Sequence, residues 1–341
     1  MRTAAFALLA AAGCAAPPPP FDAPTWEARF RPEGSAWRGA DAVYSVPLSK
    51  DRILWLFGDT LVTAPTAKGR EGAAMIRNSL AVQKLPGDPE FFWRTKAGKP
   101  SEAFECSVPG EWYWPLSGLR IGPLLHLFVM RLKARGGGAF GFAVTANEIF
   151  TVENPDAPPA DWTARRKELP FREFTFGAAS VLDRGTPHVY GHPRDSTDIY
   201  MARVPGGALD DFDQWRFYSP AGWHHTVPTQ PVFKGGATEM SVSKIGERFV
   251  AVHSAPFLSP EIQVRTAPNP DGPWSPPRTV YRCPDAAWKK GYFCYAAKAH
   301  PELAWTPDEL VITYACNSQD FWDLFRDLRL YWPRFVRVTL D

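Results

Sequence analysis

The sequence lacks a strong excess of charge and has few side chains suited to redox or metal chemistry. Its 341 residues include 38 basic and 36 acidic side chains, seven histidines and five cysteines. No basic stretch carries interleaved aromatic side chains, so nucleic acid is not an expected partner. The charge balance favours a neutral or weakly charged ligand.

Motifs that define several large enzyme classes are also absent. The sequence has no GxSxG nucleophile elbow, no HExxH zinc motif, no Walker phosphate loop and no repeated SxDxGxTW boxes of the sialidase type. Each of these motifs places specific reactive groups at a fixed spacing, and the corresponding chemistry needs that spacing. Serine esterases, zinc proteases, P-loop nucleotidases and sialidases are therefore poor candidates.

The first 14 residues are unlike the rest of the chain. Arg2 supplies a positive charge, residues 4–12 form an unbroken apolar run, and small residues directly precede Cys14. The run is too short to span a membrane, which takes about 20 residues. The pattern resembles a bacterial lipoprotein signal, so we predict a signal peptide over residues 1–14 with lipidation at Cys14. An ordinary cleaved signal is the alternative.

Residues 15–24 form a Pro/Ala-rich segment with four consecutive prolines at 17–20. Such a run favours a stiff, extended tether between the lipid and the folded domain. Lipoproteins with a residue other than Asp after the cysteine, here Ala15, commonly go to the outer membrane. We therefore predict an exported protein, lipid-anchored in the cell envelope at the outer membrane, with the lipid as its one membrane contact.

Four cysteines remain after the signal: Cys106, Cys283, Cys294 and Cys316. An even number in an exported protein indicates disulfides, and four cysteines allow three pairings. Cys283 and Cys294 are closest in sequence, so we expect that pair first. Zinc binding is the alternative, but no CxxC spacing supports it.

Proline and glycine are what the sequence has in abundance. The 35 prolines are about twice the average share of roughly 5%, and 26 glycines accompany them. Because proline interrupts both helix interiors and β-ladders, this composition favours many short strands joined by turns. Apolar residues, at 45%, are sufficient for a large buried core.

Five segments share one pattern, in which an apolar strand and a tight polar turn are followed by a second apolar strand that ends in polar residues. They begin at Asp41, Trp112, Phe176, Glu239 and Tyr295. A third strand candidate follows each hairpin, and a fourth follows the first four. The spacing therefore predicts five related units of up to four strands each.

This repeat predicts an all-β chain folded as a five-bladed β-propeller, with residues 25–341 as a single domain. The last unit lacks an outer strand. We expect an N-terminal strand around Trp26 to supply it and close the ring, which leaves no open sheet edge. A large β-sandwich built from the same strands is the alternative.

Propeller geometry brings certain polar residues to one rim. The first strand of each blade is innermost and the second runs antiparallel beside it, so the start of one and the end of the other lie together. Asp41, Asp59 and Glu239 occupy such positions and are the candidate catalytic groups. Acids, amides and flat aromatic rings suit a sugar ligand. The candidate substrate-binding residues are Arg77, Asn78, Trp112, Trp114, Asp198, His300 and Asn317.

Several of these residues also have a structural interpretation. Asp41 and Asp59 fit turn positions whose side chains bond to backbone, and Glu239 fits an exposed charge at a sheet edge. His300 fits a hydrogen-bonded structural histidine. The aromatic residues at 112–114 fit ring packing within a blade.

Six short motifs carry a family resemblance. They are WLFGDT (55–60), RNS (77–79), YMARV (200–204), NPDGPWS (269–275), HPEL (300–303) and YWPRFVRV (331–338). These motifs resemble a bacterial family of exported five-bladed propellers, which is similar to the furanosidase propellers, the arabinanase- and xylosidase-like glycoside hydrolases. Some members of that family are endo-D-arabinanases.

The resemblance implies carbohydrate hydrolysis and suggests roles for three residues. In the furanosidase propellers, a base or nucleophilic Asp opens the inner strand of the first blade, and Asp41 matches that place. A general-acid Glu opens a later inner strand, and Glu239 matches it in type, although one blade later than usual. Asp59 could replace a missing second-blade Asp that tunes the pKa of the acid.

We therefore predict a surface-anchored glycoside hydrolase that acts on a furanose-containing, arabinan-like polysaccharide or oligosaccharide. Glu239 would be the protonated acid and Asp41 the base or nucleophile. We expect a monomer with no cofactor and no catalytic metal, although a structural Ca²⁺ in the channel would fit related propellers. The alternative is a lipid-anchored propeller without turnover that binds a carbohydrate or a protein.

Overall fold

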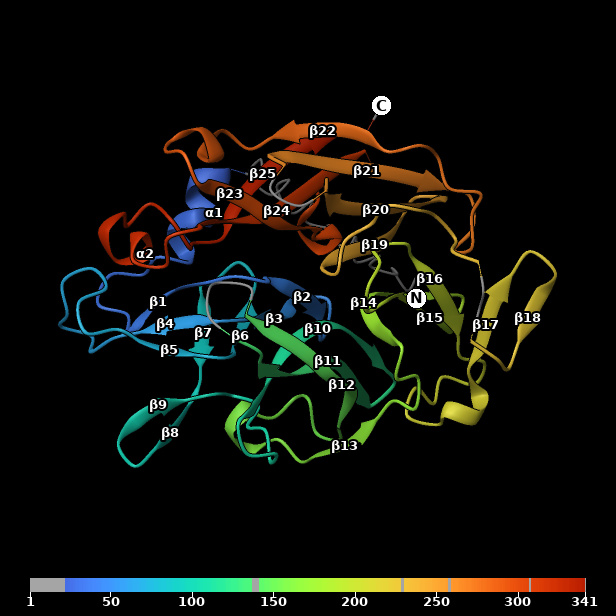
Figure 1. The fold of residues 1–341 in the computed structure, drawn as a ribbon, viewed down its shortest axis with the longest axis horizontal. Coiled ribbons are helices and arrows are strands. Elements are labelled where there is room, and N and C mark those ends of the chain that lie inside the picture. Colours follow the sequence, from blue (N-terminus) through green and yellow to red (C-terminus); the bar gives the residue numbers. More distant parts are fainter. Residues whose placement is uncertain (1–21, 137–140, 228–229, 257–258, 307, 341) are drawn as a thin grey trace, which may run out of the picture.

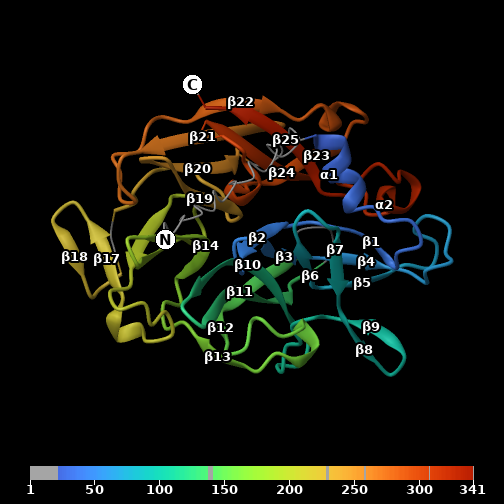
Figure 2. The same cartoon turned by 180° about the vertical axis from the view of Figure 1, so that it is seen from behind.

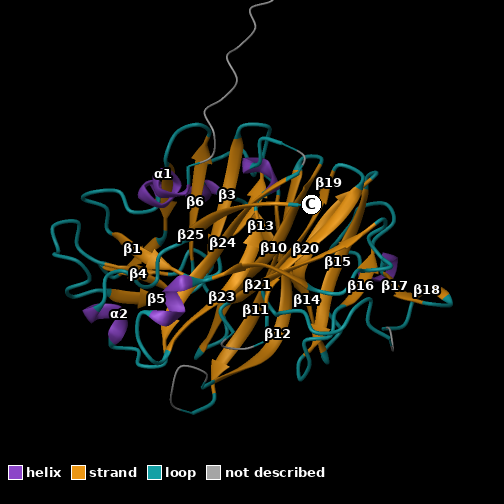
Figure 3. Cartoon of the chain, turned by 90° about the horizontal axis from the view of Figure 1, so that it is seen from above, coloured by secondary structure: helices purple, strands orange, loops and turns teal. Residues whose placement is uncertain are grey.

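The computed structural model describes residues 22–136, 141–227, 230–256, 259–306 and 308–340. Strands dominate these residues, and helices are few and short (Figure 3). No helix in the described ranges is long and apolar enough to cross a membrane. The predicted signal peptide, Cys14 and residues 15–21 of the predicted tether lie outside the described residues.

Five antiparallel sheets form the body of the molecule, and within each sheet the strands follow chain order (Figures 1 and 2). Each of the five predicted hairpins is present, as are the predicted third and fourth strands. The strands are β2 (Tyr44–Pro47), β3 (Arg52–Phe57), β6 (Ser79–Lys84) and β7 (Pro89–Phe92); β10 (Glu111–Ile121), β11 (Leu124–Ala134), β12 (Phe142–Val152) and β13 (Ala164–Glu168); β14 (Phe174–Asp183), β15 (Thr186–Pro193), β16 (Tyr200–Arg203), β17 (Arg216–Ser219) and β18 (Gly222–His224); β19 (Met240–Ile245), β20 (Arg248–Ser254), β21 (Glu261–Ala267) and β22 (Arg278–Arg282); and β23 (Tyr292–Ala299), β24 (Glu309–Ser318) and β25 (Arg334–Thr339).

Smaller elements complete the described chain. One additional sheet consists of β1 (Trp37–Ala40), β4 (Thr60–Val62) and β5 (Ala74–Ile76). Another consists of β8 (Arg94–Lys96) and β9 (Lys99–Ser101). The helices are α1 (Ala23–Arg29) and α2 (Asp323–Arg326), and the 3-10 turns are Pro159–Asp161, Phe212–Gln214, Pro284–Ala287 and Pro301–Leu303.

The first strands of successive sheets lie beside one another. Strand β10 contacts β2 and β14, β14 contacts β19, and β19 contacts β23. Side chains also connect the first and last of these strands, because the Lys298 ammonium from β23 lies 4.3 Å from the centroid of the Tyr44 ring in β2. The fold is therefore all-β and propeller-like, with the starts of these strands gathered near its centre.

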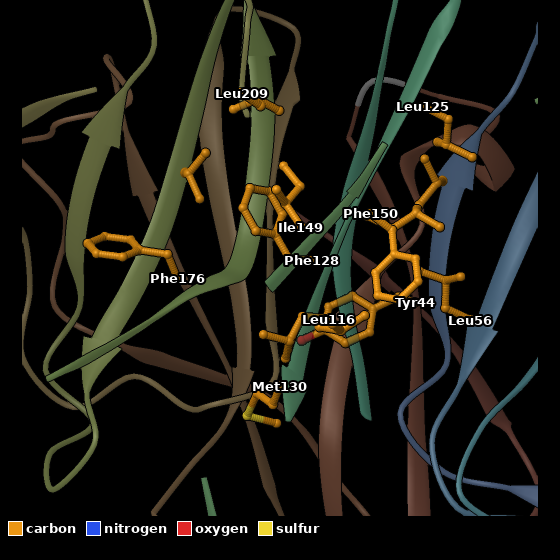
Figure 4. Close-up of a cluster of buried hydrophobic side chains, with 14 of the residues drawn as sticks. Tyr44, Leu56, Leu116, Leu125, Phe128, Met130, Ile149, Phe150, Phe176 and Leu209 are labelled. Carbon is orange, nitrogen blue, oxygen red and sulfur yellow. The ribbon is translucent and has the colours of Figure 1, made fainter. Parts of the chain in front are cut away.

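Apolar side chains fill the space between neighbouring sheets, as Figure 4 shows for the largest buried cluster. Tyr44 from β2, Leu116 from β10, Phe128 from β11 and Phe176 from β14 all belong to it. Strand β3 is buried along residues 53–57 because sheets or loops cover both of its faces. Such two-sided burial explains why the strand is a continuous apolar run rather than an alternating one.

The N-terminal strand predicted around Trp26 is wrong, because Ala23–Arg29 forms helix α1. The Asp22 carboxylate accepts a hydrogen bond from the backbone N–H of Thr25, and a proline occupies the first turn. Both features favour a helix start. The helix packs on β25, where the Glu27 carboxylate accepts a hydrogen bond from Arg334. Within the described residues, the last sheet consists of β23, β24 and β25.

The disulfide expected between Cys283 and Cys294 is not formed in the structure. Cys106, Cys283, Cys294 and Cys316 are all free in the structure. Cys294 lies directly opposite Cys316 across the β23–β24 ladder, and their sulfur atoms are 2.7 Å apart. The sheet register therefore favours Cys316 over Cys283 as the neighbour of Cys294.

Candidate active site

Asp41 lies at the centre of the candidate site, just before β2. Its backbone carbonyl accepts a hydrogen bond from the Gly58 N–H at 3.2 Å. A Cβ atom at Gly58 would lie 2.4 Å from Oδ1 of Asp41, so only glycine allows the carboxyl group to pack against this turn. The hydroxyls of Tyr295 and Tyr331 donate to Oδ2 of Asp41 at 2.6 and 3.1 Å.

Asp59 follows the same turn and is held by groups from two sheets. Arg77 donates to one carboxylate oxygen at 3.1 Å, and the indole N–H of Trp114 donates to the other at 2.8 Å. The Arg77 guanidinium also lies over the ring of Trp112, 4.5 Å from its centroid. Asp59, Arg77, Trp112 and Trp114 thus form one continuous group with a partly exposed edge.

Glu239 directly precedes β19 and forms an ion pair with Lys298 from β23, at 3.1 Å. Lys298 is almost completely buried, with 1% of its side chain exposed, while Glu239 retains 23%. The ammonium group also donates to the carbonyl oxygens of Ala42 and Ala296, and it lies 4.3 Å from the centroid of the Tyr44 ring. Lys298 therefore links Glu239 to Ala42, the residue that follows Asp41.

The three carboxyl groups differ in their neighbours. Asp59 has Arg77 and Glu239 has Lys298, whereas Asp41 has two tyrosine hydroxyls as its hydrogen-bond donors within the described part of the chain. Burial, together with the nearby negative charges of Asp59 and Glu239, raises the pKa of Asp41 to about 8. Burial also raises the pKa of Asp59, against the opposing effect of Arg77. The arrangement therefore favours a proton on Asp41 at neutral pH.

Two predicted sugar-binding residues have a structural role instead. Asn78 is completely buried, and its amide bonds to the backbone of Phe104 and Tyr113 at 2.7 to 3.2 Å. His300 is also completely buried, with its two ring nitrogens 2.7 Å from the Ser45 hydroxyl and 2.6 Å from the Thr313 hydroxyl. Because these polar groups are already paired inside the protein, both residues act in the packing of the sheets.

Asp198 and Asn317 support other parts of the site. The Asp198 carboxylate accepts a hydrogen bond at 3.1 Å from the N–H of Gly235, in the loop that leads to Glu239. Asn317 donates at 3.2 Å to the hydroxyl of Tyr295, which in turn holds Asp41. Both predicted residues thus lie near the carboxyl groups but act through intermediate residues.

The sequence reasoning missed Tyr295, Lys298 and Tyr331. Tyr295 begins the fifth repeat segment, so the rim rule covers its position, but its hydroxyl was not considered. Lys298 lies within an otherwise apolar strand and has no local signal. Tyr331 opens the motif YWPRFVRV, but nothing in that motif indicates a contact with Asp41. Tyr331 reaches Asp41 across 290 positions of the sequence.

A pocket of about 190 Å³ adjoins the aromatic edge of the site. Its lining includes Trp112, Glu102, Glu111 and Lys96. A larger cavity of about 460 Å³ is lined by Phe92, Arg94 and neighbouring residues. Asp41 and Glu239 line neither of them. The two pockets share Lys96 and Glu105 in their linings, and Trp112 is the candidate site residue that lines the smaller one.

Comparison with solved structures supports the fold. A candidate hydrolase from Bacteroides ovatus shares 17% identity, with a TM-score of 0.75 over 93% of this chain and 89% of the other. A GH43_1 enzyme from Xanthomonas citri shares 11% identity, with a TM-score of 0.53 over 93% of this chain and 96% of the enzyme. An endo-arabinase from Bacteroides thetaiotaomicron also shares 11% identity, with a TM-score of 0.51 over 91% of this chain and 96% of the other. At these identities the similarity concerns the fold.

The fold and the grouped carboxyls define an all-β, propeller-like protein whose architecture is similar to that of the GH43 glycoside hydrolases. No curated protein matches the chain. The chain belongs to the family described as a domain of unknown function, DUF5005, which matches residues 27–340.

Proposed function

We propose that this protein is a glycoside hydrolase that acts on a furanose-containing, arabinan-like polysaccharide. The observation that carries the proposal is the group formed by Asp41, Asp59 and Glu239, which three separate turns bring together beside Trp112 and Trp114. Glycosidic bond cleavage needs one carboxyl group that donates a proton and a second one that is ionised. The similarity of the fold to GH43 enzymes supports the same reaction class.

The charge arrangement supports an assignment of roles that is the reverse of the one expected from the sequence. Asp41 lacks a cationic partner among the described residues, so it is the carboxyl group best able to hold a proton and donate it to the leaving oxygen. Glu239, by contrast, forms an ion pair with the buried Lys298 side chain at 3.1 Å. We therefore propose Asp41 as the general acid and Glu239 as the base or nucleophile.

The remaining site residues bind and orient the sugar in this proposal. Asp59 and Arg77 can exchange hydrogen bonds with hydroxyl groups, and Trp112 and Trp114 offer apolar ring faces. Tyr295 and Tyr331 hold Asp41 in position. The rings of Trp112 and Trp114 meet edge to face, with their centroids 6.3 Å apart.

We also propose the finer points of architecture and location. The five sheets act as the blades of a propeller, and contacts between β2 and β23 close the ring. Residues 1–14 direct export and lipidation at Cys14, the segment between Cys14 and helix α1 acts as a tether, and the domain acts as a monomer at the cell surface. The aggregate charge of +2 is compatible with a neutral polysaccharide substrate.

The test is a panel of polysaccharides that includes arabinans, incubated with the wild-type protein and with the Glu239→Gln variant. Release of reducing ends from a furanose polymer by the wild type, and a loss of at least about 10³-fold in the variant, would support the proposal. Equal release by both proteins would remove Glu239 from the mechanism. Binding of a glycan by the wild type without any release would favour the alternative, a carbohydrate-binding propeller without turnover.

A further inference from the structure

Three buried cysteines gather beside the candidate site, in the last sheet and the segment that precedes it. Cys283, Cys294 and Cys316 are 1 to 3% exposed. The Cys294 and Cys316 sulfur atoms are 2.7 Å apart, and the Cys294 thiol also hydrogen-bonds with that of Cys283. Cys106 is distant in the fold and half-buried.

The register of the sheet makes one of the pairs suitable for a covalent bond. Cys294 and Cys316 are direct partners in the β23–β24 ladder. Directly opposed residues in an antiparallel pair have Cα atoms about 4.5–5.5 Å apart, which is within the range that a disulfide requires. The two sulfur atoms are also closer than unbonded sulfur atoms normally pack.

We propose that Cys294 and Cys316 form a cross-strand disulfide that fixes the strand pair holding Asp41, and that Cys283 remains a free thiol. Each residue of the pair is adjacent to a residue of the site network, since Tyr295 follows Cys294 and Asn317 follows Cys316. The backbone N–H of Tyr331 also donates to the Cys316 carbonyl at 2.9 Å. The disulfide therefore lies directly behind both tyrosines that bind Asp41.

The oxidation is a two-step thiol–disulfide exchange with a disulfide donor such as oxidised glutathione. The Cys294 thiolate attacks the donor, forms a mixed disulfide and releases one glutathione thiol. The Cys316 thiolate then attacks Cys294 sulfur and releases the second, so two protein thiols are oxidised and one donor disulfide is reduced. Because burial blocks access in the folded protein, the exchange takes place during folding.

Metal binding by the same group is the competing interpretation. Asp285, Cys294 and Cys316 are the described residues close enough together to hold an ion. Asp285, however, is already bound by the Tyr314 hydroxyl at 2.6 Å and by Arg334 at 3.0 Å. Tetrahedral zinc would also hold the two sulfur atoms well beyond 2.7 Å, given Zn–S bonds of about 2.3 Å.

Trypsin separates the four cysteines, so peptide mapping can test the pairing. Cleavage after Arg282, Lys290, Lys298 and Arg326 leaves Cys294 in peptide 291–298 and Cys316 in peptide 299–326. The full chain would be refolded with oxidised and reduced glutathione, alkylated under denaturing conditions and mapped by mass spectrometry. We expect a link between these two peptides, with Cys106 and Cys283 alkylated.

Matched variants and thermal unfolding complete the experiment. The link should persist in Cys283→Ser and disappear in Cys316→Ser, and dithiothreitol should lower the Tm of the oxidised wild type by roughly 5–10 °C. A link from Cys294 to Cys283, alkylation of all four cysteines after oxidative refolding, or stoichiometric zinc that is released by thiol modification would each overturn the proposal. The mapping requires no substrate, so its outcome is independent of the proposed hydrolase activity.

Discussion

At the scale of single residues, the main result is the difference between three carboxyl groups. Asp59 and Glu239 each have a cationic partner, while Asp41 has tyrosine hydroxyls and a pKa raised to about 8. Residue type and spacing identified all three as candidates. The sequence could not assign their protonation, because Lys298 and Tyr331 reach them from distant segments.

The first prediction concerns the dependence of activity on pH. A general acid acts only while protonated, and the pKa of Asp41 is about 8. We expect kcat/KM for a furanose polymer to be sustained at neutral pH and to fall about tenfold per pH unit above pH 8. A profile measured from pH 5 to 10 checks this. An alkaline limb near pH 5 instead would remove Asp41 from the acid role.

The same raised pKa predicts the effect of Asp41→Asn on stability. Between about pH 4 and pH 8 the folded state holds a proton on Asp41 that the unfolded state has lost, so the free energy of unfolding falls as pH rises through this window. Asparagine does not ionise, so the variant does not lose free energy of unfolding in this way as pH rises. It should be more stable than the wild type at pH 8 by about 1–3 kcal/mol. Urea unfolding at pH 5 and pH 8 measures the free energy of unfolding of the wild type and of Asp41→Asn. Asp320→Asn, at an exposed position, is the control and should keep the pH dependence of the wild type. If the free energy of unfolding depends on pH equally in the wild type and in Asp41→Asn, the prediction is contradicted.

Gly58 gives a third prediction at the residue scale. An alanine Cβ there would lie 2.4 Å from Oδ1 of Asp41, so the carboxyl group must move. We expect Gly58→Ala to lower kcat by about 10²-fold, because small displacements of a catalytic group have effects of this size. Gly72→Ala is the control, since Gly72 has a φ of 65° and no neighbour within 4 Å. It should lower stability slightly and leave kcat unchanged.

At the scale of elements, the sequence predicted the strands well and the chain start poorly. The five hairpins were visible because a polar turn between two apolar strands is a local signal, as in residues 44–57. Helix α1 was misread as a strand because its apolar side chains fit either pattern, whereas the Asp22 cap and the proline in its first turn select the helix. Sequence distance favoured Cys283 as the partner of Cys294, whereas the register of the sheet places Cys316 directly opposite Cys294.

At the scale of the whole molecule, the site depends on contacts between the first, fourth and last sheets. Lys298 from the last sheet donates to Ala42 beside the first sheet and to Glu239 at the start of the fourth. Asp41 and Tyr331 are 290 positions apart in the sequence. The repeat could predict which strand ends converge on one rim, but the partner of each side chain depends on how the sheets pack.

Lys298 therefore offers a test of this long-range connection. Lys298→Met would leave Glu239 without its cation and Ala42 without a donor, and we expect a loss of about 3–5 kcal/mol in the free energy of unfolding. Arg282→Gln breaks an ion pair with Glu261 in which the Arg282 side chain is 67% exposed, and it should cost less than about 1 kcal/mol. Denaturant unfolding at neutral pH compares the two. A small effect in both would show that the buried ion pair does not hold the sheets together.

The most direct test of the account is a comparison of leaving groups in Asp41→Asn and Glu239→Gln. A substrate with an activated aryl leaving group does not need an acid, so Asp41→Asn should retain most activity on an aryl arabinofuranoside while it loses at least about 10³-fold on the polymer. Glu239→Gln should lose activity on both substrates. The opposite pattern would restore Glu239 as the acid, and hydrolysis of neither substrate by the wild type would contradict the assignment as a glycoside hydrolase.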